Sequence, residues 1–478
     1  MKKILFLTIL FFTINTLFAQ KCNCKQEFEW IKTTFEQNDA GFQYVIDKKG
    51  KPEYENFNIR IHNQLDTITN PIKCNDILSE WAKFFRNGHL NISAKTPENT
   101  NQPATSEKVN FTKSDFDSYL KSTNLSPYEG IWKFSGYTIG IKKINQEFIG
   151  FIIESKNPNW KLNEVKLKFS INTKNEVDGS FFYGDHSLYK FSIAKVINEE
   201  YINLNGSYLK KVNYTSKSKK NGNDKIAIAI KSSSADKPYL DKLNKTTLLL
   251  RIPSFDESNT KFIDSIVKKN LKLLTTTPNL IVDIRNNGGG SDACYYPLLP
   301  IFYTNPIRTI GMEMYSTTLN NARYDKLLKS EDFDAESKKG FAKGKEIVMK
   351  HLGEFVNTDS EKFSVTTFPK VNEFPKNIAV LINERNGSTA EEFLLAAKQS
   401  RKVKLYGTTT FGVLDISNMN FVTSPSGLFE LGYSLSRSFR IPKMTIDSKG
   451  IIPDFYLDES IPDENWIDYV DKLLNNKD

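Results

Sequence analysis

The chain has 478 residues, of which 25% are charged, and a formal net charge of +9. This length predicts two to three domains rather than one ordinary core. The lysines are spread along the chain without a dense cluster, which argues against a nucleic-acid-binding protein. A basic surface could equally favour acidic partners or a peptide carboxylate.

The first 19 residues have the plan of a secretory signal peptide. Lys2 and Lys3 precede an almost unbroken apolar run from Ile4 to Phe18, and the small residue Ala19 follows. The run is short for a membrane anchor, and no later segment predicts a membrane span. We therefore predict cleavage near Ala19 and an exported protein, periplasmic or extracellular, without a membrane span.

Four cysteines follow the predicted cleavage point, at Cys22, Cys24, Cys74 and Cys294. Export permits disulfides, and we predict a bridge from Cys22 or Cys24 to Cys74. Such a bridge closes a loop of about 50 residues and stabilises the fold by roughly 4 kcal/mol in the loop-entropy description. A metal site is the rival interpretation of the Cys-x-Cys pair, but no histidine or third cysteine lies at a ligand-like spacing. We predict neither a metal nor a cofactor.

Residues 20–102 have the pattern of a small helical region, with amphipathic runs at 28–31 and 77–85. Asn87-Gly88 then ends the helix and a strand-like run follows, so His89 stands at an element boundary. A lone histidine in such a place is more often a surface or packing residue than a functional one.

Residues 103–235 change to short runs that alternate apolar and polar residues, most regularly from Val165 to Ile171. Polar loops separate these runs. The pattern predicts an antiparallel β-domain, a meander or a small barrel. It shows no residues that suggest chemistry.

From residue 236 to the end, buried strands alternate with helices, as in a βαβ unit. The strand predicted at 280–285 ends in Asn286-Asn287-Gly288-Gly289-Gly290. Consecutive glycines let backbone N–H groups approach a ligand closely, which suits an anion or an oxyanion. The simpler interpretation is a tight turn, and the ending of a phosphate-binding loop is missing. Residues 305–372 are charged and lysine-rich, and we predict that they form an insertion, a candidate cap over the site.

Ser388 lies between an apolar strand-like run at 378–382 and a helix-like run at 393–397. The first N–H groups of a helix lack intrahelical partners, and together with the helix dipole they favour a developing negative charge. A serine at this turn can attack a carbonyl beside its own anion site. The alternative is a capping box, in which Ser388 and Glu391 satisfy the helix start. In either case Glu391 and Glu392 are interpreted as helix-start residues.

Four stretches, taken in order, resemble the tail-specific or C-terminal processing serine peptidases and their tricorn-core relatives. They are Leu280–Gly290, Ser388–Phe393, Thr410–Gly412 and Gly450–Asp454. The resemblance covers about residues 240–478, extends to the region around His89, and leaves out the β-domain. It implies an α+β/α/β protein with a crotonase-like (ClpP-like) α/β peptidase core.

The same resemblance implies roles for individual residues. Ser388 matches the nucleophile, and the oxyanion hole would use the N–H of Thr389 with an N–H from the loop that holds Gly288 and Gly289. In the bacterial processing proteases a lysine follows the glycine of Thr-Phe-Gly as general base. Val413 occupies that position here and cannot accept a proton, so a Ser-Lys dyad is not expected.

The tricorn-like branch uses a histidine from the N-terminal part and an acidic residue before the Gly-Ile/Val-x-Pro-Asp signature. His89 in Asn87-Gly88-His89 matches the histidine, and Asp447 matches the acidic position, where tricorn itself has glutamate. Imidazole can take the serine proton near neutral pH while a carboxylate fixes its tautomer. The PDZ-type module that processing proteases usually carry is missing, and the β-domain occupies its place.

The sequence therefore predicts an exported serine endopeptidase that acts on unfolded proteins or peptides through an acyl-enzyme on Ser388, with His89 as base and Asp447 as acid. One alternative is a catalytically inactive peptide- or lipid-binding protein on the same fold, which the loss of lysine at Val413 motivates. Another is an acyl-CoA-type hydrolase, against which export and the missing nucleotide signature count. No sequence feature indicates the oligomeric state.

Overall fold

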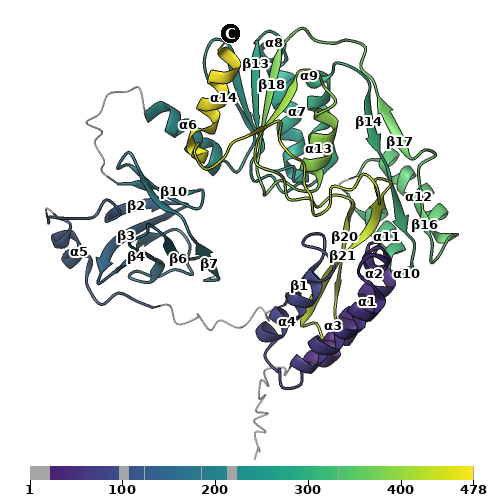
Figure 1. Ribbon diagram of the computed structural model, residues 1–478, viewed down its shortest axis with the longest axis horizontal. Helices are drawn as coiled ribbons and strands as arrows, with labels where there is room; N and C mark the ends of the chain where they lie inside the picture. The colour runs from purple at the N-terminus through teal and green to yellow at the C-terminus, as the bar shows by residue number, and fades with distance from the viewer. Residues whose placement is uncertain are drawn as a thin grey trace, which may run out of the picture. The chain divides into compact units, whose positions relative to one another are not determined.

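The computed structural model describes residues 22–95, 107–122, 124–184, 186–212, 223–331 and 333–476 (Figure 1). The predicted signal peptide, residues 1–19, lies outside these ranges. The chain forms two compact units. Unit 1 comprises Met1–Pro97, Met312–Ser360 and Ile416–Arg437, and unit 2 comprises Glu98–Gly311, Glu361–Asp415 and Ser438–Asp478. Within the described ranges, no helix combines the length and apolar character that crossing a membrane requires.

Unit 1 combines helices with a five-stranded sheet. Its helices are α1 (Cys24–Asn38), α2 (Phe42–Lys49), α3 (Lys51–Gln64), α4 (Pro71–Lys83), α10 (Thr318–Asn321), α11 (Arg323–Lys329) and α12 (Ala335–Met349). Its strands are β1 (Asn91–Ala94), β15 (Met312–Tyr315), β16 (Phe355–Val356), β20 (Ile416–Thr423) and β21 (Phe429–Ser438). The sheet order is β1-β21-β15-β16, and β20 also pairs with β21.

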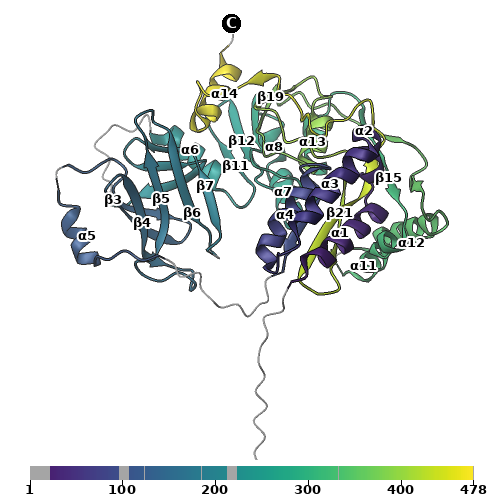
Figure 2. The same cartoon turned by 60° about the horizontal axis from the view of Figure 1, so that its bottom comes forward.

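The core of unit 1 joins the N-terminal helices to a strand from near the C-terminus. Phe35 and Trp81 pack in one buried cluster with Leu431 and Tyr433 of β21, and Figure 2 shows the purple helices beside this yellow strand. Helix α4 begins where the Asn70 side chain accepts the first orphan N–H groups. It ends just before the segment that carries His89, which leads into β1.

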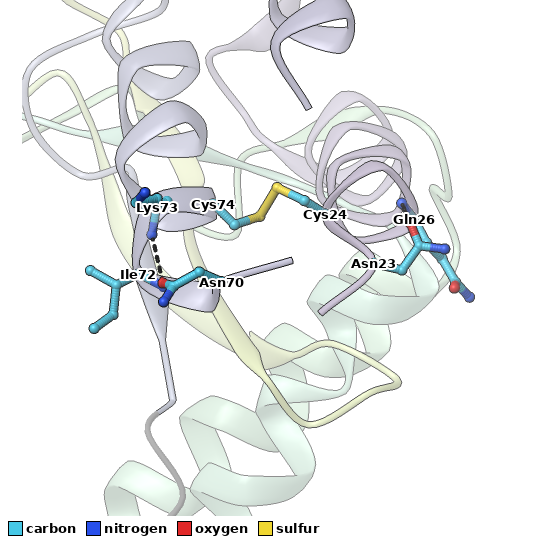
Figure 3. Close-up of a disulfide and its surroundings, with 7 residues drawn as sticks. All are labelled: Asn23, Cys24, Gln26, Asn70, Ile72, Lys73 and Cys74. Atoms are coloured by element: carbon cyan, nitrogen blue, oxygen red, sulfur yellow. Dashed lines mark hydrogen bonds between the residues drawn. A yellow bond between two sulfur atoms is a disulfide. The ribbon is translucent and has the colours of Figure 1, made fainter. Parts of the chain in front are cut away.

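A disulfide between Cys24 and Cys74 links α1 to α4 (Figure 3). The predicted bridge to Cys74 is thus confirmed, and of the two possible partners the structure selects Cys24. Cys22 and Cys294 are buried thiols outside the bridge.

The first part of unit 2 is a nine-stranded antiparallel sheet, which confirms the predicted antiparallel β-structure. Its strands are β2 (Gly130–Phe134), β3 (Tyr137–Ile144), β4 (Glu147–Ser155), β5 (Val165–Ile171), β6 (Val177–Phe182), β7 (Leu188–Phe191), β8 (Ala194–Ile197), β9 (Tyr201–Leu204) and β10 (Ser207–Lys211). They follow the order β7-β6-β5-β4-β3-β2-β10-β9-β8. The helix α5 (Lys113–Tyr119) precedes them.

The second part of unit 2 is a six-stranded sheet with helices on both faces. The strand order is β11 (Tyr239–Lys242), β12 (Thr247–Arg251), β13 (Asn279–Asp283), β18 (Asn377–Ile382), β19 (Val403–Gly407) and β22 (Phe455–Tyr456). The helices of this part are α6 (Asn223–Ser234), α7 (Thr260–Lys269), α8 (Leu271–Leu274), α9 (Leu299–Phe302), α13 (Thr389–Ala397) and α14 (Trp466–Asn475). A separate two-stranded ribbon joins β14 (Ile307–Ile310) to β17 (Phe363–Thr366).

Strands β12, β13, β18, β19 and β22 run parallel, and only β11 is antiparallel. Both faces of this sheet are buried, which explains the continuous apolar runs in its sequence. Leu248 and Leu250 pack on the face that α7 and α13 cover, while Leu249 packs with α14 on the other face (Figure 1). The carboxyl ends of β13, β18 and β19 therefore meet at one edge, where α/β sheets place their ligands.

The segment 305–372 contributes to both units. Its ends form the β14–β17 ribbon of unit 2, whereas residues 312–360 belong to unit 1 and supply β15 and β16 to its sheet. The domain division and the role of this segment as a cap stay predictions.

Candidate active site

Ser388 stands at the turn from β18 into α13, as the sequence predicts. Its backbone is strained, with φ 56° and ψ −128°, and its N–H donates to the Val413 carbonyl at 3.1 Å. A strained strand-to-helix turn is how many hydrolases present a nucleophilic serine. The Ser388 side chain makes no capping hydrogen bond to the helix. The capping-box alternative is therefore wrong, since the serine side chain does not cap the helix and the Ser388 N–H goes to Val413.

The glycine loop after β13 lies directly against this turn. Gly289 has φ 103°, and a Cβ there would stand 2.8 Å from the Ser388 Cβ and 2.9 Å from the Thr389 nitrogen. A Cβ at Gly290 would stand 2.1 Å from the Phe255 carbonyl oxygen. The loop thus requires glycine for close approach, which a plain tight turn would not demand.

Two asparagines fix the loop to the serine turn. The Asn386 amide donates to the carbonyls of Ile284 (2.6 Å) and Asn287 (3.1 Å). The Asn287 side-chain oxygen accepts the N–H of Gly289 at 3.0 Å. No described residue bonds the N–H of Gly288 or of Thr389. Of the three residues predicted for an oxyanion hole, Gly288 and Thr389 therefore keep an N–H that no described residue bonds, whereas Gly289 does not.

Glu391 anchors the loop that follows β19. It is fully buried, and its carboxylate accepts from the Thr410 hydroxyl (2.5 Å), the Gly412 N–H (2.8 Å) and the Val413 N–H (2.9 Å). Burial raises the pKa of Glu391, and these hydrogen bonds act against the rise. Because Val413 in turn accepts from Ser388, this carboxylate supports the serine turn. The sequence interpretation of Glu391 as a helix-start residue misses this role.

His89 lies in unit 1, half-buried, at φ 53°. Its Nδ1 stands 2.8 Å from the carbonyl oxygen of Ile416. A carbonyl can only accept, so Nδ1 carries the hydrogen and the lone pair of the neutral ring is on Nε2. Burial lowers the pKa of His89, the bond to Ile416 acts in the opposite direction, and the Arg86 charge adds to the lowering. The ring is thus neutral near pH 7, as a general base must be.

Asp447 lies in unit 2 and holds the segment before Ile416. Its carboxylate accepts the N–H groups of Leu414 (2.6 Å) and Asp415 (2.7 Å). The Asp415 carboxylate accepts the N–H of Asp447 (2.9 Å) and bonds the Arg440 guanidinium (2.7 Å). Asp447 and His89 therefore bind consecutive stretches of one segment, residues 414–415 and residue 416.

The structure thus gathers Ser388, Thr389 and the glycine loop at one edge of the parallel sheet. His89 belongs to the other unit and Asp447 to the same unit as Ser388. Within the described part of the chain, no group of three or more histidine, cysteine, aspartate or glutamate residues could hold a metal ion.

Residues 246–457 match the family model described as peptidase family S41. Among solved structures, the chain resembles mature CPAF, with 13% identity, coverage of 95% of this chain and 96% of that chain, and a TM-score of 0.51. At this identity the likeness shows a shared fold.

Two further solved structures are more distant. The photosystem II D1 C-terminal processing protease matches with 11% identity over 95% of this chain and 98% of that chain, at a TM-score of 0.39. The tricorn protease matches with 11% identity over 95% of this chain and 36% of that chain, at a TM-score of 0.41. No curated protein sequence matches the chain.

Proposed function

We propose that this chain is a member of peptidase family S41, the tail-specific and C-terminal processing serine-type peptidases, and that Ser388 is the nucleophile with which it cleaves peptide bonds. Its substrate is a polypeptide. The observation that carries the proposal is the strained turn of Ser388, packed against a loop that only glycine can form. We infer that the polypeptides are unfolded proteins or peptides.

Ser388 and the N–H groups around it supply the first half of the reaction. The Ser388 Oγ attacks the carbonyl carbon, and the carbonyl oxygen becomes an oxyanion. The N–H of Thr389 and the N–H of Gly288 stabilise that charge, since fixed N–H dipoles require no reorganisation. The N–H of Gly289 is already given to Asn287, so Gly289 serves by its close approach and Gly288 by its donor.

His89 moves the proton. Its Nε2 takes the hydrogen from the Ser388 Oγ during attack and gives it to the leaving amine when the C–N bond breaks. A water molecule, deprotonated by the same nitrogen, then hydrolyses the acyl-enzyme. The support for this role is the bond of Nδ1 to Ile416, which selects the tautomer with a basic Nε2.

Asp447 completes the proposed triad as a positioning residue. Its carboxylate holds the N–H groups of Leu414 and Asp415, and the next residue, Ile416, presents the carbonyl that binds His89. In this arrangement the acid orients the imidazole through the chain that it anchors.

We also propose a core fold and an exported location for this chain. The four parallel strands from β12 to β19 support a crotonase-like, ClpP-like core within residues 236–478, preceded by the helical region 20–102 and the β-domain 103–235. The Cys24–Cys74 disulfide supports export after removal of residues 1–19. N-terminal sequencing of the mature protein tests this, with Gln20 as the expected first residue.

A fluorophosphonate probe and a casein-cleavage assay test the catalytic proposal. We expect the purified protein to be labelled and to cleave casein, and the Ser388→Ala variant to lose labelling and to lose at least ~1,000-fold in rate. Ser360→Ala, at an exposed serine, is the matched control and keeps both activities. Full activity in Ser388→Ala would falsify the proposal. A folded wild type that is neither labelled nor active would favour the non-catalytic peptide- or lipid-binding alternative.

A further inference from the structure

The Arg86 guanidinium binds the main chain at His89. The carbonyl oxygen of His89 accepts from Arg86 Nη2 (2.8 Å) and from the Ser434 hydroxyl (3.0 Å). The carbonyl of Gly88 accepts from Arg86 Nε (3.1 Å). Two consecutive carbonyls are therefore bound by the planar fork of a single side chain, a geometry that lysine cannot reproduce.

Arg86 is itself fixed by Asp39. The two side chains form a bidentate pair, with Nη1 2.8 Å from Oδ1 and a second bond from Nη2 to Oδ2. Their exposed fractions are 8% and 0%. The Asp39 carboxylate also accepts the N–H groups of Gly41 (2.8 Å) and Ser434 (2.9 Å). Asp39 thus ties the α1–α2 turn to β21, and Arg86 is fixed between them.

The backbone that these bonds hold is an unfavourable one. His89 has φ 53°, and a residue with a Cβ adopts such a conformation only where its surroundings offset the strain. A buried ion pair seldom adds net stability over apolar residues of the same volume. The Asp39–Arg86 pair binds the main chain of His89, and positioning that residue explains the pair better than added stability does.

We propose that the buried Asp39–Arg86 pair positions His89 for catalysis, by fixing its main chain so that Nδ1 meets the Ile416 carbonyl. This inference rests on the proposed function, in which His89 takes the proton of Ser388. Arg86 and Asp39 are positioning residues, since neither is required to touch the substrate. The pair joins residues 47 positions apart in sequence, and no motif announces it.

The same guanidinium acts on the charge of the ring. From the segment after α4 the Arg86 cation faces His89, and from the α1–α2 turn Asp39 faces Arg86. The strands β20 and β21 contribute the uncharged Ile416 carbonyl and Ser434 hydroxyl. Together with burial, the Arg86 charge lowers the pKa of His89, and the bond to Ile416 opposes this. Arg86 therefore makes two separable contributions, one through hydrogen bonds and one through charge.

Two variants separate these contributions. The double variant Asp39→Asn/Arg86→Gln leaves no unpaired buried charge, and Arg86→Lys keeps the charge but loses the fork. We measure kcat and KM on a peptide substrate, the pH dependence of kcat/KM, and Tm. Arg60→Gln, at an exposed arginine of α3, is the control for loss of a positive charge in the same unit.

For the double variant we expect kcat to fall roughly 10- to 100-fold with KM unchanged, because a misplaced base affects the transition state more than binding. The acid limb of its kcat/KM profile moves to higher pH, because the pKa of His89 rises without the cation. For Arg86→Lys we expect a similar fall in kcat and an acid limb at the wild-type position. Arg60→Gln matches the wild type in both.

The inference is overturned if the folded double variant keeps the wild-type kcat and acid limb while His89→Ala is inactive, an outcome that leaves the proposed function standing. A fully active His89→Ala instead removes the proposed base itself. If the double variant does not fold, Arg86→Lys and Ser434→Ala decide. Wild-type kcat in both contradicts the inference, and a reduced kcat at unchanged KM supports it.

Discussion

Ser388 and His89 share a positive φ, of 56° and 53°, but their surroundings constrain them in two different ways. At Ser388 the constraint is steric, because a Cβ on Gly289 would stand only 2.8 Å from the serine Cβ. At His89 the constraint is electrostatic, because Arg86 donates to the carbonyls of Gly88 and His89 and is itself fixed by the Asp39 carboxylate. Close backbone contact thus constrains Ser388, whereas an ion pair and its hydrogen bonds constrain His89.

The difference indicates which substitutions disturb Ser388 and which disturb His89. The surroundings of Ser388 come from loops that follow neighbouring strands of one parallel sheet, so added volume at one backbone position disturbs them. The surroundings of His89 come from segments up to 395 residues apart in sequence, as in the bond from the Ser434 N–H to Asp39. Loss of one charge or one donor is what disturbs them.

The largest effect is expected from Gly289→Ala on the serine side. The new methyl would stand 2.8 Å from the Ser388 Cβ and 2.8 Å from the Gly387 carbonyl oxygen, and φ 103° is strained for alanine. We expect kcat/KM to fall by about 100-fold or more, since small shifts of a nucleophile cost that much. Gly340→Ala, in open space on α12, is the control and keeps the wild-type rate. Equal rates in both variants would show that close packing at Gly289 does not constrain Ser388.

Glu391→Gln is expected to have the next largest effect. The amide NH₂ of glutamine replaces one carboxylate oxygen and cannot accept the Val413 N–H if the other oxygen keeps Thr410 and Gly412. Leaving one buried donor unpaired costs about 1–3 kcal/mol of unfolding free energy. We expect this loss in urea unfolding, with a roughly 10-fold lower kcat because the serine turn loses its support.

The control for Glu391 is Glu336→Gln, an exposed glutamate in the first turn of α12. If Glu391 only assisted the helix start, both substitutions would cost similar amounts of unfolding free energy, about 0.3–1 kcal/mol. A similar, small change in the two variants would therefore restore the helix-start interpretation. A large loss of unfolding free energy in Glu391→Gln alone supports the role of Glu391 in anchoring the loop after β19.

The sequence predicts the serine side well because its signals are local. Continuous apolar runs mark β13 and β18, a glycine run marks the close approach, and Ser388 begins a helix. Of the surroundings of the proposed base, the sequence indicates only His89 itself, through a resemblance. Asp39 and Arg86 carry no pattern, because their pairing depends on how α1 and α4 pack, and that packing is decided by the whole core of unit 1.

Glu391 shows a second limit of sequence reasoning. An acidic residue in a first helical turn looks the same whether it faces water or another loop. Only the strand order, which places β19 beside β18, brings Thr410–Val413 over this carboxylate. Similarly, β15 and β16 have four and two residues, too few for an alternating pattern, so their place in the sheet of unit 1 came from the fold alone.

On the base side, we expect Cys24→Ser/Cys74→Ser to affect stability more than rate. Loss of the bridge removes up to ~4 kcal/mol of unfolding free energy in the loop-entropy description. The bridge enters α4 in its first turn, whereas His89 lies beyond the other end, so kcat changes less than in Glu391→Gln. Urea unfolding with and without reductant checks this, since reductant should weaken the wild type and leave the double variant unchanged.

The smallest expected effect is on the pH dependence of the wild type. The pH at which kcat/KM falls in acid reports the pKa of His89 directly. General-base catalysis requires neutral His89, so kcat/KM falls as the pH drops through its pKa. Burial and the Arg86 charge hold that pKa below the ordinary value of 6.5. We therefore expect activity to persist below pH 6.5 and to decline only in more acidic solution. The unfolded chain takes up a proton at higher pH than the folded chain, so the His89 contribution to stability declines over the same acidic range. A midpoint at or above 6.5, measured with a peptide at constant ionic strength, would mean that burial and the Arg86 charge do not outweigh the bond to Ile416, and would contradict a lowered pKa of His89.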